Sequence, residues 1–223
     1  FVYKPDAVDW KFIMIITKIK RNRLNYDVYI DEELAFTLTD EGLYKSRLKT
    51  GVEIEQTEHL NEIIREDEIK RCKNRALRII TDSPKSAAKV AEKLKKENFS
   101  DSAVSHALDF LGEYSFIDDK RLAENITKKA VRSNSSVRQI KNSLYKKGIK
   151  KEDIEKAVSE VDSDQEEENA IKVAIKKYNT LKGKSDEEVL RKIYYTLSYK
   201  GFSYSACDKA MSKIKSMLGN YED

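Results

Sequence analysis

The sequence predicts a mainly α-helical fold of tandem three-helix repeats in an elongated array, with a small strand-containing segment at the N-terminal end. Three observations predict it. Charged residues make up 37% of the 223 residues, with 2 Pro and 7 Gly, a composition that favours helices over long flexible linkers. A pattern of apolar residues returns about every 50 residues. Near the N-terminal end, by contrast, apolar and polar residues alternate.

The repeated pattern consists of five apolar positions that keep their spacing in three copies. Each residue of the first copy has a counterpart 50 residues later, which has its own counterpart 53 residues further on. Helical repeats of this length bury their apolar faces by stacking against neighbouring repeats. The three copies are Leu94, Phe99, Val104, Ala107 and Leu111; Leu144, Ile149, Ile154, Ala157 and Val161; and Leu197, Phe202, Cys207, Ala210 and Ile214.

Each copy also carries the signals that end one helix and start another. Asn98, Gly148 and Gly201 stand between the first two apolar positions, and both residue types tolerate the left-handed conformation that often follows a helix. We therefore predict a helix, a tight left-handed stop and a second helix in each copy. Serine N-caps are predicted for the helices before the stops, at Ser86, Ser136 and Ser185, the last in a capping box with Glu188.

These signals divide the chain into five parts. Residues 1–13 show no clear periodicity and precede Met14, which could start a natural chain, so we expect an extra or non-native arm there. Residues 14–54 alternate β-branched and aromatic residues, which predicts two or three short antiparallel strands followed by a helix that begins near Asp40. The three-helix repeats are predicted at residues 55–117, 118–161 and 162–223.

The sequence disfavours membrane proteins and several classes of enzyme. It has no run of about 18 apolar residues, and no phosphate-binding loop, dinucleotide-binding turn or nucleophile elbow. Cys72 and Cys207 lack metal-binding spacing and are expected to be reduced, packed thiols in a cytoplasmic protein. His59 and His106 have no second ligand at a metal-binding spacing. We therefore expect no metal, no cofactor and no enzymatic activity.

Asp118 and Asp119 are the residues most suggestive of metal or acid–base chemistry, because adjacent carboxylates can share such a role. The alternative is structural: Asp118 caps a helix that begins near Lys120, and Asp119 complements the dipole of that helix. A catalytic site would need convergent partners, and no His, Cys or glycine-rich loop stands nearby in the sequence. We therefore predict the structural role.

Tyrosines are concentrated between residues 193 and 204, where they could stack on nucleic-acid bases. Tyr194, Leu197 and Phe202 fall at core-like spacing, so we predict that these three residues are packed. The positions expected to be more open are Tyr195 and Tyr199.

Positive charge is concentrated in the second and third repeats. Residues 120–157 hold 12 basic and 4 acidic residues, residues 169–217 hold 11 and 4, and residues 65–119 hold 11 of each. Such a concentration is typical of a protein with a polyanionic partner, although each cation taken singly also suits an ordinary solvated helix. The predicted partner- and DNA-binding residues are Arg121, Lys128, Lys129, Arg132, Arg138, Lys141, Lys146, Lys147, Lys150 and Lys151.

Four segments together have the pattern of a known family. They are the strand-rich YDVYIDEELAF with LKTG, the serine-led SAAKVAEKLKKENF, the junction FIDDKRLAENI, and SSVRQIKNSLYKKGI. With these segments, the chain after Met14 resembles the RecX family, the bacterial regulators of the RecA recombinase. The chain departs from the family pattern at the first stop, which is Asn98 rather than glycine.

The resemblance implies an elongated, curved protein of three tandem three-helix repeats that lies in the groove of the RecA–DNA filament. It implies restraint of the recombinase, ATPase and coprotease activities of RecA, without catalytic residues. We expect a cytoplasmic monomer with weak, non-specific affinity for single- and double-stranded DNA and none for membranes. Two other classes stay open: a helix-turn-helix transcriptional regulator that reads duplex DNA, and a scaffolding solenoid that needs neither DNA nor recombinase.

Overall fold

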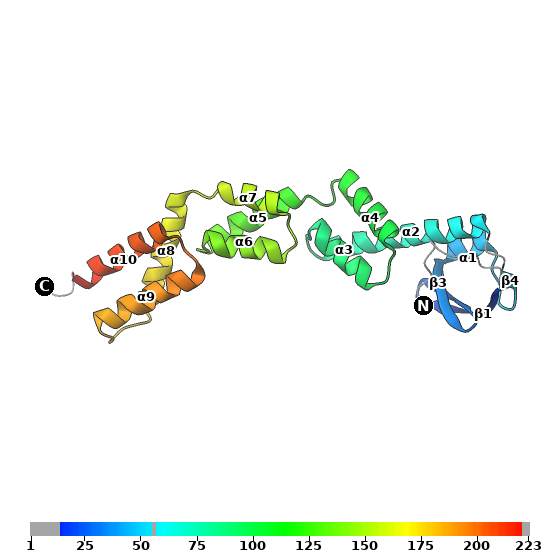
Figure 1. Ribbon diagram of the computed structural model, residues 1–223, viewed down its shortest axis with the longest axis horizontal. Helices are drawn as coiled ribbons and strands as arrows, with labels where there is room; N and C mark the ends of the chain where they lie inside the picture. The colour runs from blue at the N-terminus through cyan, green and yellow to red at the C-terminus, as the bar shows by residue number, and fades with distance from the viewer. Residues whose placement is uncertain (1–13, 55–56, 220–223) are drawn as a thin grey trace. The chain divides into compact units, whose positions relative to one another are not determined.

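The computed structural model describes residues 14–54 and 57–219 (Figure 1). The chain forms two compact units, one of residues up to Pro84 together with 89–117, the other of residues 85–88 together with those from Asp118 onward. The predicted arm at residues 1–13 lies outside the described residues. The predicted fold class is confirmed, because three-helix repeats follow one another and the strands of the described chain all lie in the N-terminal segment.

The N-terminal segment is a four-stranded antiparallel sheet with a short helix between its third and fourth strands. The sequence predicts the first three strands but not β4, since two residues are too few to show alternation. Helix α1 (Asp40–Ser46) begins after Thr39, whose side chain accepts a hydrogen bond from the N–H of Gly42. In the order β3-β2-β1-β4, the strands are β1 (Met14–Asn22), β2 (Asn25–Ile30), β3 (Glu33–Thr39) and β4 (Glu53–Ile54).

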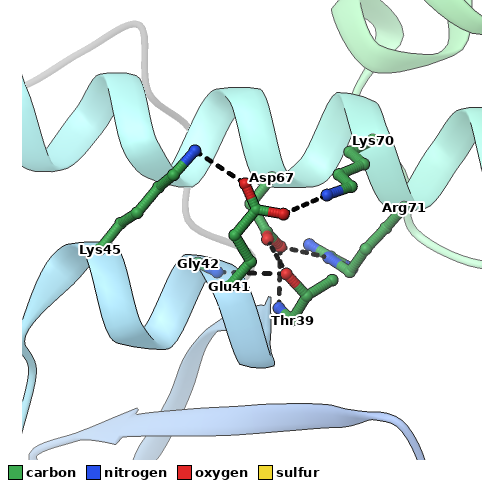
Figure 2. Close-up of polar contacts among 7 residues, drawn as sticks. All are labelled: Thr39, Glu41, Gly42, Lys45, Asp67, Lys70 and Arg71. Carbon is green, nitrogen blue, oxygen red and sulfur yellow. Dashed lines mark hydrogen bonds and ion pairs between the residues drawn. The ribbon is translucent and has the colours of Figure 1, made fainter.

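A buried carboxylate on α2 (Glu58–Asp82) joins this helix to the N-terminal segment (Figure 2). The side chain of Asp67 is 5% exposed and accepts hydrogen bonds from the N–H of Thr39 at 3.0 Å, from the Thr39 hydroxyl, and from Nε of Arg71 at 3.1 Å. A buried charge is tolerated when it is paired and hydrogen-bonded in this way. A Cβ on residue 42 would lie 2.5 Å from Asp67 Oδ1, so α1 approaches α2 this closely because Gly42 has no side chain.

Each three-helix repeat has an apolar core of its own. The cores contain the apolar positions that recur in the sequence, among them Leu94, Leu144 and Leu197, which are fully buried. The helices after α2 are α3 (Ala87–Lys96), α4 (Asp101–Glu113), α5 (Asp119–Arg132), α6 (Val137–Lys146), α7 (Lys151–Ser159), α8 (Ser163–Tyr178), α9 (Asp186–Lys200) and α10 (Tyr204–Gly219).

The three predicted stops are confirmed. Asn98, Gly148 and Gly201 have φ angles of 63°, 74° and 78°. In each case the N–H of the following residue donates to the carbonyl five positions earlier, the bond that closes a Schellman motif. These bonds are Phe99 to Leu94 at 3.3 Å, Ile149 to Leu144 at 3.2 Å and Phe202 to Leu197 at 3.2 Å.

Two of the predicted serine N-caps carry the predicted cap, but the predicted capping box is in the wrong repeat. Ser136 accepts from the N–H of Gln139, whose side chain accepts from the Ser136 N–H, so the box forms at α6. Ser185 accepts from the N–H of Glu188, but the Glu188 carboxylate does not return the bond. It pairs instead with the lysines four residues before and after it, Lys184 and Lys192.

The two cysteines are free and buried, as predicted. Burial raises the pKa of Cys72 to about 12 and also raises the pKa of Cys207, so both thiols are protonated and unreactive at neutral pH. Within the described residues, no group of three or more His, Cys, Asp or Glu side chains could hold a metal ion. No helix there is long and apolar enough to cross a membrane.

Candidate functional site

The ten basic residues predicted to contact a partner all lie in the second repeat, and nine of them are exposed. The tenth, Lys141, is half-buried. Helix α5 carries Arg121, Lys128, Lys129 and Arg132; α6 carries Arg138, Lys141 and Lys146; the turn after α6 carries Lys147 and Lys150; and α7 begins with Lys151.

Arg138 has a structural role that the sequence does not reveal. Its Nη2 donates to the backbone carbonyls of Ser198 at 3.2 Å and Tyr199 at 2.7 Å, near the end of α9. The last carbonyls of a helix lack partners within the helix, and a guanidinium can satisfy two of them at once. Arg138 of α6 therefore caps α9, and its predicted contact with a partner stays a prediction.

Three others of the ten cations have acidic neighbours. Lys141 Nζ pairs with the Glu155 carboxylate at 2.8 Å. Lys128 and Arg132 line a hollow between α5, α7 and the start of α8 that also contains Glu124, Glu160 and Asp162. Neighbouring carboxylates reduce the attraction of a cation for another anion, so these three residues are the weaker candidates.

The α6–α7 turn holds the strongest group of candidates. Lys146, Lys147, Lys150 and Lys151 are exposed and form no ion pair within the described residues. The next acids along the chain, Glu152 and Asp153, lie in the first turn of α7, where negative charge complements the helix dipole. We call Lys146, Lys147, Lys150 and Lys151 the turn lysines. Together they concentrate positive charge on this turn, where Lys150 interacts electrostatically with Asp119 and none of the four forms an ion pair within the described residues.

The adjacent carboxylates Asp118 and Asp119 both bind backbone N–H groups. Asp118 is the N-cap of α5, as predicted, and accepts from the N–H of Arg121 at 2.9 Å. Asp119 lies in the first turn of α5 and accepts from the N–H of Ala87 at 3.0 Å. Burial raises the pKa of Asp119. The structural role of this pair, rather than a chemical one, fits these contacts.

The tyrosines of α9 are more exposed than the sequence predicts. Leu197 and Phe202 are buried, as expected, but Tyr194 is 50% exposed, so its predicted core position is wrong. The buried face of α9 runs through Val189, Ile193 and Leu197 at a spacing of four residues, and the residue after Ile193 lies outside it. Tyr195 and Tyr199 are exposed, as predicted.

Comparison with known proteins identifies the family of this chain. Residues 72–111 match the model of the first three-helix domain of RecX, and residues 164–211 match that of the third. A regulatory protein RecX from Clostridioides difficile (strain 630) is 36% identical over 204 residues, which cover 90% of this chain and 95% of the relative. The chain belongs to the RecX family. Another RecX, from Clostridium perfringens (strain SM101 / Type A), is 32% identical over 87% of this chain and 92% of its own.

Solved structures from the RecX family have the same fold. The crystal structure of a regulatory protein RecX aligns with a TM-score of 0.64 at 23% identity and covers 90% of this chain and all of that one. RecX from Lactobacillus salivarius aligns with a TM-score of 0.62 at 25% identity and covers 67% of this chain and 98% of its own. The relatives are named regulatory proteins, and the RecX family is thereby a family of regulators.

Proposed function

We propose that this RecX-family chain binds the RecA–DNA filament and restrains the recombinase, ATPase and coprotease activities of RecA. The observation that carries the proposal is the group of turn lysines, which are exposed and have no ion-pair partner within the described residues. Four exposed cations on one turn repel one another, and a polyanionic partner relieves that repulsion. The name of the relatives, regulatory proteins, supports a role in control rather than in catalysis.

The chemistry of the turn lysines suits phosphate or acidic protein surface. Lysine ammonium groups contact phosphates as point charges and carry no information about base sequence. We therefore propose that contacts with DNA, single- or double-stranded, are weak and non-specific, and that specificity for the filament comes from RecA protein. The proposed partner places this chain in the cytoplasm, where we propose that it acts as a monomer.

A strand-exchange assay with purified RecA tests the proposal. We expect this protein to slow exchange when it is present at far fewer copies than RecA, and to slow ATP hydrolysis by the filament in parallel. Unchanged exchange and unchanged hydrolysis at every ratio would contradict the proposed function.

The contribution of the turn lysines can be measured with a charge-reversal variant and a matched control. The variant carries Lys146→Glu, Lys147→Glu and Lys151→Glu. The control makes the same change in net charge at three exposed lysines of the first unit that form no ion pair within the described part of the chain, namely Lys20, Lys49 and Lys93. We expect the variant to lose inhibition while the control keeps it, with circular dichroism showing that both are folded. Equal inhibition by both would show that the turn lysines are only a solvated surface.

The sequence preference of DNA binding distinguishes the proposed function from that of a transcriptional regulator. A helix-turn-helix regulator binds one duplex sequence far more tightly than others, because its side chains read base edges in the major groove. Selection of a preferred duplex from a random library, without any effect on RecA, would favour that alternative. We expect no preferred duplex sequence.

A further inference from the structure

Helix α9 presents a stripe of large exposed side chains that the fold does not require. Arg191, Tyr195 and Tyr199 follow one another at a spacing of four residues and therefore share one face of the helix. Tyr195 is 69% exposed and Tyr199 is 76% exposed. Their rings lie nearly parallel, with an interplanar angle of 18° and centroids 6.2 Å apart.

The stripe is separate from the core of the third repeat. Helix α9 is held there by Val189, Ile193 and Leu197, which are buried on another face. Two aromatic rings this exposed contribute little to folding, whereas grouped exposed aromatic residues are typical of binding surfaces. The stripe is therefore available to a ligand without any change in the repeat.

Cationic groups lie at both ends of the tyrosine pair. Arg191 is exposed one turn before Tyr195 and forms no ion pair within the described residues. At the other end, the guanidinium of Arg138 donates to the carbonyls of Ser198 and Tyr199 through Nη2. Its Nε and Nη1 form no hydrogen bond within the described part of the chain, so they can still donate to an anion.

Negative charge on α9 lies at the start of the helix. Glu187 shares the face of the stripe, one turn before Arg191, but stands eight residues before Tyr195. The acids of the helix, Asp186, Glu187 and Glu188, are all in its first turn, and Glu188 is neutralised by two lysines. Tyr195 is seven residues beyond Glu188, about two helical turns. An aromatic pair between two arginines, with the acids of the helix confined to its first turn, matches a ligand that combines flat rings with negative charge.

We infer that Tyr195 and Tyr199 form a stacking platform for the unpaired bases of single-stranded nucleic acid, with Arg191 and Arg138 contacting the phosphates on either side. Base stacking on aromatic side chains is tolerant of sequence, because every base has a flat π-face. In a duplex the bases are paired and stacked inside the helix, so the platform favours single strands. The inference deepens the nucleic-acid part of the proposed function but does not depend on the turn lysines.

Binding of the full-length chain to labelled oligothymidine, measured by fluorescence anisotropy, tests the inference. Loss of one stacked base weakens binding by about tenfold. We expect the double variant Tyr195→Ser/Tyr199→Ser to bind oligothymidine at least ~10-fold more weakly than wild type. For an abasic oligonucleotide of equal length, the affinity of this variant should equal that of wild type. The variant Tyr195→Phe/Tyr199→Phe keeps the rings and should bind normally.

A matched control uses two other exposed tyrosines. Tyr44 is 86% exposed and Tyr204 is 82% exposed, and neither lies on α9. We expect Tyr44→Ser/Tyr204→Ser to bind oligothymidine as wild type does. Circular dichroism shows whether each variant is folded.

Three results would overturn the inference. The first is normal binding of oligothymidine by folded Tyr195→Ser/Tyr199→Ser. The second is that this variant binds oligothymidine and the abasic strand with equally weakened affinity. The third is the absence of any binding of oligothymidine by wild type. The last result, combined with normal inhibition of RecA, would overturn the stacking platform and leave the proposed function intact. Conversely, a base-dependent loss together with unchanged strand exchange in the presence of wild type would support the platform and contradict the proposed function.

Discussion

The hydroxyl of Ser136 donates a 2.6 Å hydrogen bond to the backbone carbonyl of Lys200, 64 residues further along the chain. The same hydroxyl accepts from the N–H of Gln139, so one buried side chain caps the start of α6 and the end of α9. Beside this bond, the Glu166 carboxylate accepts from the N–H of Val137 at 3.0 Å. Side chains of one repeat thus satisfy backbone groups at the helix ends of another: Ser136 satisfies the end of α9, and Glu166 of α8 satisfies the start of α6.

The same pair of contacts occurs a second time in the second unit. The Ser86 hydroxyl donates to the carbonyl of Lys147, and Asp119 accepts from the N–H of Ala87. Ser86 stands 50 residues before Ser136, and Lys147 stands 53 before Lys200. The spacing of the repeat therefore reproduces the contacts of the helix ends as well as the apolar core.

Replacement of Ser136 by alanine is expected to destabilise the second unit. The change removes an N-cap and leaves the Lys200 carbonyl without its partner, and together these losses cost about 2–3 kcal/mol. Denaturant unfolding measures the change in free energy. Ser133→Ala is the control, because the Ser133 hydroxyl is exposed and bonds only within its own helix turn, to the Lys129 carbonyl. A Ser136→Ala variant no less stable than the control would contradict this account of the contact.

A side chain at residue 201 is expected to disturb the cap of α9. Gly201 has a φ of 78°, and a Cβ there would lie 1.9 Å from Nε of Arg138. Gly201→Ala therefore adds left-handed strain of about 1–2 kcal/mol and also displaces the guanidinium from its two carbonyls.

Comparison with Gly183→Ala isolates the second effect, the displacement of the guanidinium. Gly183 has a φ of 80°, but a Cβ there would meet no atom within 4 Å. We expect Gly183→Ala to show the strain alone and Gly201→Ala to be less stable by a further ~1 kcal/mol or more in thermal unfolding. Equal losses of stability in the two variants would mean that the contact of residue 201 with Arg138 has no effect on stability.

The ion pairs of Glu41 are expected to make the first unit sensitive to acid. Lys45, at 2.8 Å, and Lys70 both pair with this carboxylate (Figure 2) and lower its pKa from 4.5 to about 2. The folded chain then binds fewer protons than the unfolded chain between these values, so the pairs stabilise the fold above pH 4.5 and lose that effect as the pH falls to about 2.

Glu41→Gln should therefore lower the melting temperature at pH 7 and have no effect near pH 2. High salt should reduce the difference at pH 7, because these groups are exposed to solvent. Glu62→Gln serves as the control, since Glu62 is exposed on α2 and forms no ion pair among the described residues. If Glu41→Gln lowers the melting temperature by the same amount at both pH values, the electrostatic explanation is ruled out.

Reversal of Lys146, Lys147 and Lys151 is expected to reduce the salt dependence of DNA binding. Each lost phosphate contact lowers the slope of log K against log salt by about 0.7–0.9, so the triple variant should lose up to about 2–3 from the slope. A salt series on naked DNA and on the filament gives both slopes. If the slope changes for the filament but not for naked DNA, the turn lysines contact RecA protein instead of DNA.

The stops of the three repeats could be predicted because they depend on local chemistry. A left-handed residue and the bond that closes its motif involve six consecutive residues, and Asn98, Gly148 and Gly201 all adopt the expected φ. The same holds for the caps at Asp118 and Ser136, whose acceptors and donors lie three residues apart. The capping box expected at Ser185 does not form, because two lysines compete for the Glu188 carboxylate.

Local patterns of residues specify the helices and their stops, and the recurrence of the core and the concentration of cations in the second and third repeats can be read directly along the chain. The helices and their stops depend on residues within a few turns of one another. The packing of the helices, by contrast, determines that Arg138 caps α9, that Asp67 holds Thr39, and that Ser136 binds the end of α9. These partners stand 28 to 64 residues apart. Which polar groups meet at such a separation depends on how whole helices pack, and the local pattern of residues does not contain that information.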